Sequence, residues 1–249
     1  MFSVEERDRI RDRILEMADA DQRVVAAAAI GSLATGPGDQ WSDLDLGFGI
    51  ADGSSVDAVL GKWTDTLERE FEAVHLFDLP RGPAVYRVFL FPGYLQVDLS
   101  FAPASQFGAL GPNFTLLFGR AVERPHMTQP SAQDLFGLGV HHAVRTRFCI
   151  ERGRLWQAQY WINEMRDHAL ALACRRRGLE VVEARGYQGL PEDVLARFED
   201  TLVRSIERAE LLRALARTTD ELLREADEAG ELASKVEGQL RRLVTVEWS

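Results

Sequence analysis

The sequence is poor in cysteine. Its 249 residues include two, Cys149 and Cys174, which lie in segments of helical periodicity and form no CxxC pair. This scarcity argues against a disulfide framework and against a zinc site, and a reducing cytoplasm is the expected compartment.

Long apolar runs and an excess of basic residues are also lacking. No run approaches the roughly 20 apolar residues that span a bilayer, and the charged N-terminal segment has no apolar signal core, so no membrane partner is expected. Asp and Glu number 39 against 29 Lys and Arg, which gives a formal net charge of −10. Because nucleic-acid backbones are bound by clustered Lys and Arg, no nucleic-acid partner is expected either.

The first half of the chain mixes helix and strand patterns. Ser3 with Glu6 forms a capping box and predicts a helix over residues 3–20. A second helix is predicted over residues 55–70. Apolar runs predict strands over residues 24–30, 44–50, 73–79, 85–91, 95–101 and 115–118, and Pro92-Gly93 predicts a hairpin between the fourth and fifth of these.

Past Pro130 the strand patterns stop, and apolar residues recur every three or four positions. Helices are predicted over residues 131–150, 154–177, 191–216 and 218–243. The sequence therefore predicts an α+β fold, in which an N-terminal mixed-sheet domain (residues 1–128) precedes a C-terminal helical bundle (residues 129–249).

Asp43 and Asp45 stand one residue apart at the start of a predicted strand. Side chains alternate along a strand, so these carboxylates share one face, while Leu44 and Leu46 point into the core. Two neighbouring carboxylates repel each other, and a cation between them removes that cost. Mg²⁺ prefers such oxygen ligands. The pattern indicates a metal site, with a charged strand edge facing solvent as the alternative.

Two further features support a functional site. Gly31-Ser32 follows an apolar strand directly, where glycine lets the backbone approach a phosphate and exposed N–H groups bind anions. Asp98 lies inside an apolar strand, and an unpaired buried carboxylate is costly. Coordination of a metal beside Asp43 and Asp45 explains it, and a salt bridge to Arg87 across the hairpin is the alternative.

These residues resemble a known family. Gly31-Ser32, then Ser42-Asp43-Leu44-Asp45, then Asp98 on a later strand, is similar to the pattern of the polymerase-β-type nucleotidyltransferase superfamily. The spacing resembles that of aminoglycoside (kanamycin-type) and lincosamide nucleotidyltransferases, which also have a helical C-terminal domain.

The resemblance implies a mechanism. Two Mg²⁺ ions bridge three carboxylates to the triphosphate of ATP or another NTP, and a hydroxyl attacks the α-phosphate in line. The metal ligands and catalytic carboxylates are Asp43, Asp45 and Asp98, and the phosphate contacts are Gly31, Ser32 and Ser42. The resemblance also implies a general base early in the helical domain, which matches Glu151 best and Glu164 second. Either one could instead be a surface carboxylate of a helix.

One helix of the bundle presents an aromatic face. Trp156, Tyr160, Trp161 and Glu164 fall at helical spacing, which predicts a platform for a ring-bearing acceptor, with ordinary bundle core as the alternative. The related kanamycin-type enzymes are dimers with shared sites, so the resemblance implies a homodimer.

The sequence thus predicts Mg²⁺-dependent transfer of a nucleoside monophosphate, AMP from ATP, to a hydroxyl of a small molecule such as an aminoglycoside or lincosamide antibiotic. A protein-modifying AMP transferase or antitoxin-type enzyme is one alternative, and a non-catalytic nucleotide-binding module is another.

Overall fold

The computed structural model describes residues 1–36, 38–125 and 128–245, so Pro37 of the predicted glycine-rich loop lies outside the described residues. The chain divides into two compact units, Met1–Met127 and Thr128–Ser249. Each unit has its own hydrophobic core. Among the helices of the described ranges, none combines the length and the apolarity needed to cross a membrane.

The N-terminal unit is built on a six-stranded sheet of order β3-β4-β5-β2-β1-β6. Its strands are β1 (Val24–Ile30), β2 (Leu44–Ile50), β3 (Val74–Arg81), β4 (Ala84–Phe91), β5 (Leu95–Pro103) and β6 (Phe114–Phe118). β2 and β5 run parallel, and the other neighbouring pairs are antiparallel. The mixed sheet confirms the predicted fold class for this half of the chain.

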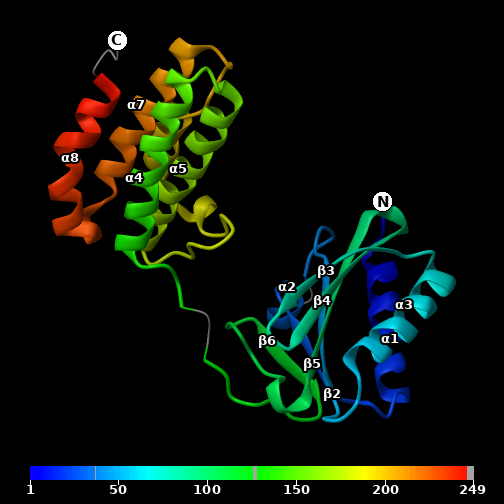
Figure 1. The fold of residues 1–249 in the computed structure, drawn as a ribbon. Helices are drawn as coiled ribbons and strands as arrows, with labels where there is room; N and C mark the ends of the chain where they lie inside the picture. The colour runs from blue at the N-terminus through cyan, green and yellow to red at the C-terminus, as the bar shows by residue number, and fades with distance from the viewer. Residues whose placement is uncertain (37, 126–127, 246–249) are drawn as a thin grey trace. The chain divides into compact units, whose positions relative to one another are not determined.

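Helices α1 (Val4–Ala20) and α3 (Val56–Phe71) cover one face of this sheet (Figure 1). Alternate residues of β2 and β5 point into the core beneath them, where Trp63 makes edge contacts with Phe48 and Phe101 at ring-centroid distances of 4.9 and 5.3 Å. The opposite face carries small residues such as Ala28 and Ala102, which pack with Phe107. The polar side chains of β2 and β5 therefore project from the face that α1 and α3 leave uncovered.

The second unit is helical, as predicted. It contains α4 (Ala132–Glu151), α5 (Leu155–Arg175), α6 (Glu192–Glu199), α7 (Arg208–Arg224) and α8 (Gly230–Thr245). The apolar faces of α4, α5 and α7 meet in a core that includes Phe136, Ile162 and Leu215.

Two of the predicted helices are wrong in their bounds. The predicted helix over 191–216 is broken between α6 and α7, where the buried Thr201 hydroxyl donates to the Phe198 carbonyl at 2.6 Å. Such a side-chain bond competes with helical bonding. The predicted helix over 218–243 starts inside α7 and is broken at residues 227–229. The helical spacing of apolar residues continues across this break and across the break between α6 and α7, so it does not mark either one.

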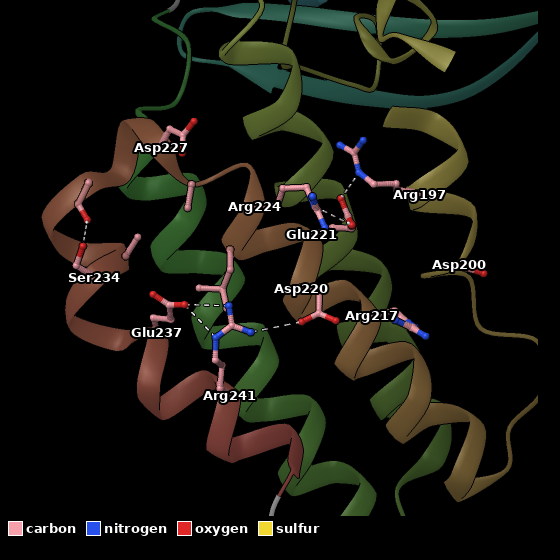
Figure 2. Close-up of a pocket in the computed structure, with 14 residues that line it drawn as sticks. Arg197, Asp200, Arg217, Asp220, Glu221, Arg224, Asp227, Ser234, Glu237 and Arg241 are labelled. Carbon is pink, nitrogen blue, oxygen red and sulfur yellow. Dashed lines mark hydrogen bonds and ion pairs between the residues drawn. The ribbon is translucent and has the colours of Figure 1, made fainter. Parts of the chain in front are cut away.

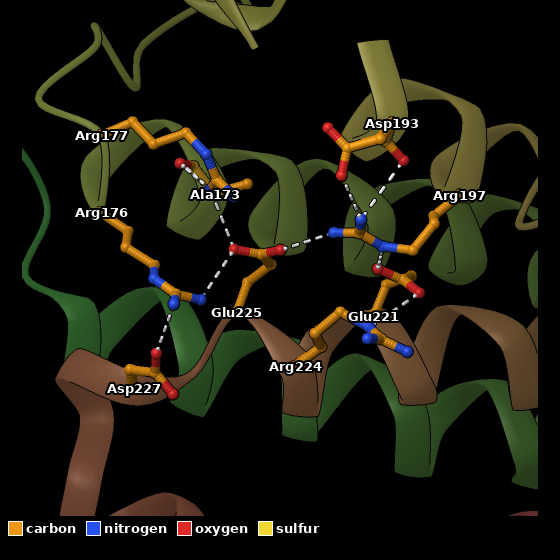
Figure 3. Close-up of polar contacts among 9 residues, drawn as sticks. All are labelled: Ala173, Arg176, Arg177, Asp193, Arg197, Glu221, Arg224, Glu225 and Asp227. Atoms are coloured by element: carbon orange, nitrogen blue, oxygen red, sulfur yellow. Dashed lines mark hydrogen bonds and ion pairs between the residues drawn. The ribbon is translucent and has the colours of Figure 1, made fainter. Parts of the chain in front are cut away.

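Arginines and carboxylates connect the helices of this unit (Figure 3). Glu225, which is 2% exposed, accepts from Arg177 at 3.0 Å and from Arg197 at 3.1 Å. Arg197 also donates to Glu221 at 3.0 Å. Because a buried carboxylate is stable only when paired, these contacts fix the end of α7 against α6 and the segment after α5.

Candidate functional site

Asp45 on β2 lies opposite Asp98 on β5 in the parallel register, which also pairs Leu44 with Val97. Neighbouring strands lie about 4.8 Å apart, so the two aspartates are adjacent on one sheet face. Leu44 and Val97 are fully buried on the side of α1 and α3. Both carboxylates therefore project from the uncovered face, next to each other.

The predicted alternative for Asp98, a salt bridge to Arg87, is wrong. Arg87 pairs in register with Leu99, so its side chain lies on the opposite face, where it donates to Asp78 at 2.6 and 2.7 Å. Asp98 accepts from the amide of Gln96 at 3.1 and 3.2 Å. Burial and the nearby charge of Asp43 raise the pKa of the Asp98 carboxyl above its ordinary value.

The side chains of this acidic pair turn away from each other. The Asp45 carboxylate lies against Gly31, at a place that a Cβ on Gly31 would overlap, while Asp98 turns to Gln96. In the described part of the chain, no group of three or more His, Cys, Asp or Glu side chains is arranged to hold a metal ion. Convergence of Asp43 with the pair on Mg²⁺ stays a prediction.

The glycine that follows β1 adopts a conformation that few other residues tolerate. Gly31 has φ 65° and ψ −139°, and it caps the short helix α2 (Ser32–Thr35). Its own N–H donates to the Asn113 carbonyl at 3.2 Å. The N–H groups of Ser32 and Leu33 lie in the first turn of α2 and have no partner within that helix. Phosphate binding at this loop would therefore use these amides rather than that of Gly31.

Ser42 is held inside its own loop. Its hydroxyl accepts from the Asp39 N–H at 2.9 Å and donates to the Asp39 carboxylate at 3.0 Å. Arg7 of α1, fully buried, donates to the Asp39 carbonyl at 2.6 Å. Arg7 thus fixes the loop that leads into Asp43. No local pattern signals this role, because Arg7 stands in a run of alternating charges that is typical of a solvated helix face.

Glu151 has the contacts of a structural carboxylate. Its Oε1 accepts from Arg147 at 2.6 Å and its Oε2 accepts from Arg208 at 2.7 Å. The Arg208 contact, followed by that of Arg147, lowers the pKa of Glu151. A base needs a lone pair that is free to accept a proton, so this environment opposes the predicted role.

The residues of the predicted aromatic platform differ in their exposure to solvent. Trp156 is 74% exposed and Tyr160 is 50% exposed, so both are available to a ligand. Trp161 is partly buried and packs at a tilt against His142, with ring centroids 4.9 Å apart. The Arg145 guanidinium lies 4.6 Å from the centre of the Trp161 ring. Glu164 is partly buried on the same helix, and no hydrogen bond or salt bridge to it exists among the described residues.

A separate cleft of about 760 Å³ lies in the helical unit, between α6, α7 and α8 (Figure 2). Side chains of both signs line it, and they pair with each other: Arg241 contacts Glu237 at 2.9 Å, and Arg197 contacts Glu221 at 3.0 Å. None of the predicted site residues lines this cleft.

Comparison with known proteins gives distant structural similarity. No protein-family model matches the sequence, and no curated protein matches it. The fold is similar to an aminoglycoside 6-adenyltransferase from Bacillus subtilis, with TM-score 0.41 and 12% identity over 99% of this chain and 100% of that chain. It is also similar to a nucleotidyltransferase-like protein from Exiguobacterium sibiricum, with TM-score 0.39 and 16% identity over 92% of this chain and 78% of that chain.

A third similar structure is a nucleotidyltransferase toxin from Mycobacterium tuberculosis, with TM-score 0.25 and 17% identity over 97% of this chain and 92% of that chain.

Proposed function

We propose that this protein is a Mg²⁺-dependent nucleotidyltransferase that moves AMP from ATP to a hydroxyl of a small molecule. The observation that carries the proposal is the registered pair of Asp45 and Asp98 on parallel neighbouring strands. No salt bridge to Asp98 exists among the described residues, and Arg87 lies on the other face. Two adjacent carboxylates on an uncovered face suit a divalent cation that takes its other ligands from phosphate.

The residues present fit Mg²⁺ in their chemistry. Asp45, Asp98 and Asp43 would hold it, since all three are oxygen donors and the charge of Asp43 already reaches Asp98. Bound Mg²⁺ would neutralise charge on the transferred phosphate and on the departing pyrophosphate. The amides of Ser32 and Leu33 would orient the terminal phosphates, and the Arg7–Asp39 contact would hold Ser42 and Asp43 in place.

For the general base, the contacts favour Glu164 over Glu151. Both oxygens of Glu151 already accept from arginines, whereas Glu164 keeps its carboxylate for another partner. Glu164 also lies on the helix that carries the exposed Trp156 and Tyr160. Proton removal by a positioned carboxylate contributes about 10²–10⁴ in rate.

The test is a pyrophosphate-release screen with the full chain, Mg²⁺ and each nucleoside triphosphate, against a panel of aminoglycosides and lincosamides. We expect release with ATP that depends on one class of acceptor, and a product that is heavier by one AMP. Modification of a protein with no small-molecule turnover would support a protein-modifying enzyme. Nucleotide binding without any transfer would support a non-catalytic module.

A further inference from the structure

An exposed apolar strip lies on the same sheet face as the acidic pair. β3 is an edge strand, and its Phe77 and Leu79 are 48% and 44% exposed. Leu90 of β4 is 36% exposed. Soluble proteins rarely leave adjacent large apolar side chains in water without a use for them.

The strand register places this strip beside the carboxylates. Phe77 pairs with Val88, Val88 pairs with Asp98, and Asp98 pairs with Asp45, so one row crosses four strands. In the next row, Leu79 pairs with Tyr86. Paired residues of neighbouring strands share a face. The apolar strip is defined as the exposed Phe77, Leu79 and Leu90 together with Tyr86, which is partly buried, and Val88, which is 4% exposed. In the row that leads to the acidic pair, the buried Val88 lies between Phe77 and Asp98.

The strand order also decides which reactant meets the strip. The Gly31 loop follows β1, which lies on one side of β2 and β5, while β4 and β3 lie on the other side. In an in-line displacement, the attacking and leaving oxygens stand on opposite sides of the phosphorus. With pyrophosphate toward Gly31, as the proposed function requires, the attacking hydroxyl arrives over β4 and β3.

We propose that the apolar strip binds the acceptor, and that the acceptor is a hydroxylated molecule with an apolar chain or ring near its reactive hydroxyl. Strands are about 4.8 Å apart, so β3 places this apolar part within about 10 Å of the reacting oxygen. This inference rests on the proposed function and narrows its substrate class. A wholly polar polycation would leave the strip in water.

The edge of the strip is poorly suited to pairing with a second copy of the chain. Pro80 has no N–H to donate, and the β3–β4 register shifts between His75 and Phe77. Prolines and bulges are the features that keep edge strands from adding another strand. A small ligand that lies on the face of the strip needs no edge hydrogen bonds.

The experiment compares the wild type with the double variant Phe77→Gln/Leu90→Gln in the pyrophosphate-release assay, with lincosamides as the amphipathic probes and aminoglycosides as the polar ones. We expect lincosamides to be the better acceptors and the variant to raise the acceptor KM about tenfold or more. The KM for ATP and kcat should be unchanged, because contacts made equally in ground and transition states affect KM alone. Leu117→Gln, on the opposite edge strand and 43% exposed, is the matched control.

A preference for aminoglycosides, or an unchanged acceptor KM in the double variant, would overturn the inference. If the double variant does not fold, the single variant Phe77→Gln takes its place. Calorimetric titration with a lincosamide, without nucleotide, tests acceptor binding separately from nucleotidyl transfer. If the wild type binds the lincosamide and the double variant does not, the apolar strip is the acceptor site even where no transfer occurs. No binding to the wild type contradicts it, and so does a wild-type dimer that the double variant converts to a monomer.

Discussion

Arg7 in the first helix donates a hydrogen bond of 2.6 Å to the backbone carbonyl of Asp39, 32 residues further along the chain. Arg7 is fully buried, and Asp39 in turn holds the Ser42 hydroxyl. The order of the loop before Asp43 therefore depends on a side chain from a different element.

Replacement of Arg7 should loosen that loop. Arg7→Met removes a charged donor from the Asp39 carbonyl, a loss of about 1.5–3 kcal/mol in the free energy of unfolding. It should also raise the KM for ATP, since Ser42 and Asp43 lose their support. Urea unfolding and steady-state kinetics measure both effects, with exposed Arg9→Met as the matched control. Equal stability of the two variants would contradict this account of Arg7.

The two glutamates of the bundle should respond differently to removal of charge. Glu164→Gln should lower kcat by about 10²-fold or more with little change in the KM for ATP, as expected when a transition-state role is lost. Glu151→Gln should instead lower the thermal midpoint, because Arg147 and Arg208 lose their carboxylate. The reverse outcome, an inactive Glu151→Gln beside an active Glu164→Gln, would restore Glu151 as the base.

The stability of the helical unit should depend on His142 in mildly acidic solution. Burial, followed by the charges of the neighbouring His168, His141 and Arg145, lowers the pKa of His142 to about 4. The unfolded value is about 6.5, so the unfolded state binds more protons between about pH 6.5 and 4. The free energy of unfolding should therefore fall as the pH drops through this window, by about 2 kcal/mol between pH 7 and 5 for this group.

His142→Phe keeps an aromatic ring at this position but removes the titratable imidazole. Urea unfolding at several pH values should show a shallower fall for this variant than for the wild type, while exposed His141→Phe should follow the wild type. Parallel curves for all three proteins would show that His142 does not couple folding to pH.

The strand pattern predicted most of the N-terminal unit. The apolar runs predicted β1 and β2 at their observed bounds, and the capping box at Ser3 is present in the structure. The helix breaks were missed because the apolar period of 3.6 continues through Thr201 and through residues 227–229, where local hydrogen bonds decide the geometry.

The site itself could be predicted only in part. The alternation of side chains along β2 and β5 correctly predicted that Asp45 and Asp98 share one sheet face. Alternation within a strand does not give the register between β4 and β5, which places Arg87 on the other face. Arg147 pairs with Glu151 at i, i+4 on one helix, but the Arg208 contact of Glu151 and the support from Arg7 are tertiary contacts between residues far apart in sequence. No local pattern encodes such contacts.

The most direct test of the central claim is transfer of labelled AMP from ATP in the presence of Mg²⁺ by the wild type, Asp45→Asn and Asp98→Asn. We expect each substitution to lower turnover at least about 10²-fold, the effect of losing several kcal/mol of charge stabilisation in the transition state. The thermal midpoint of Asp98→Asn should not fall, because burial and the charge of Asp43 raise the pKa of this carboxyl and so disfavour its ionised form in the folded protein. Turnover near that of the wild type in either variant would contradict the assignment of this pair as the catalytic centre.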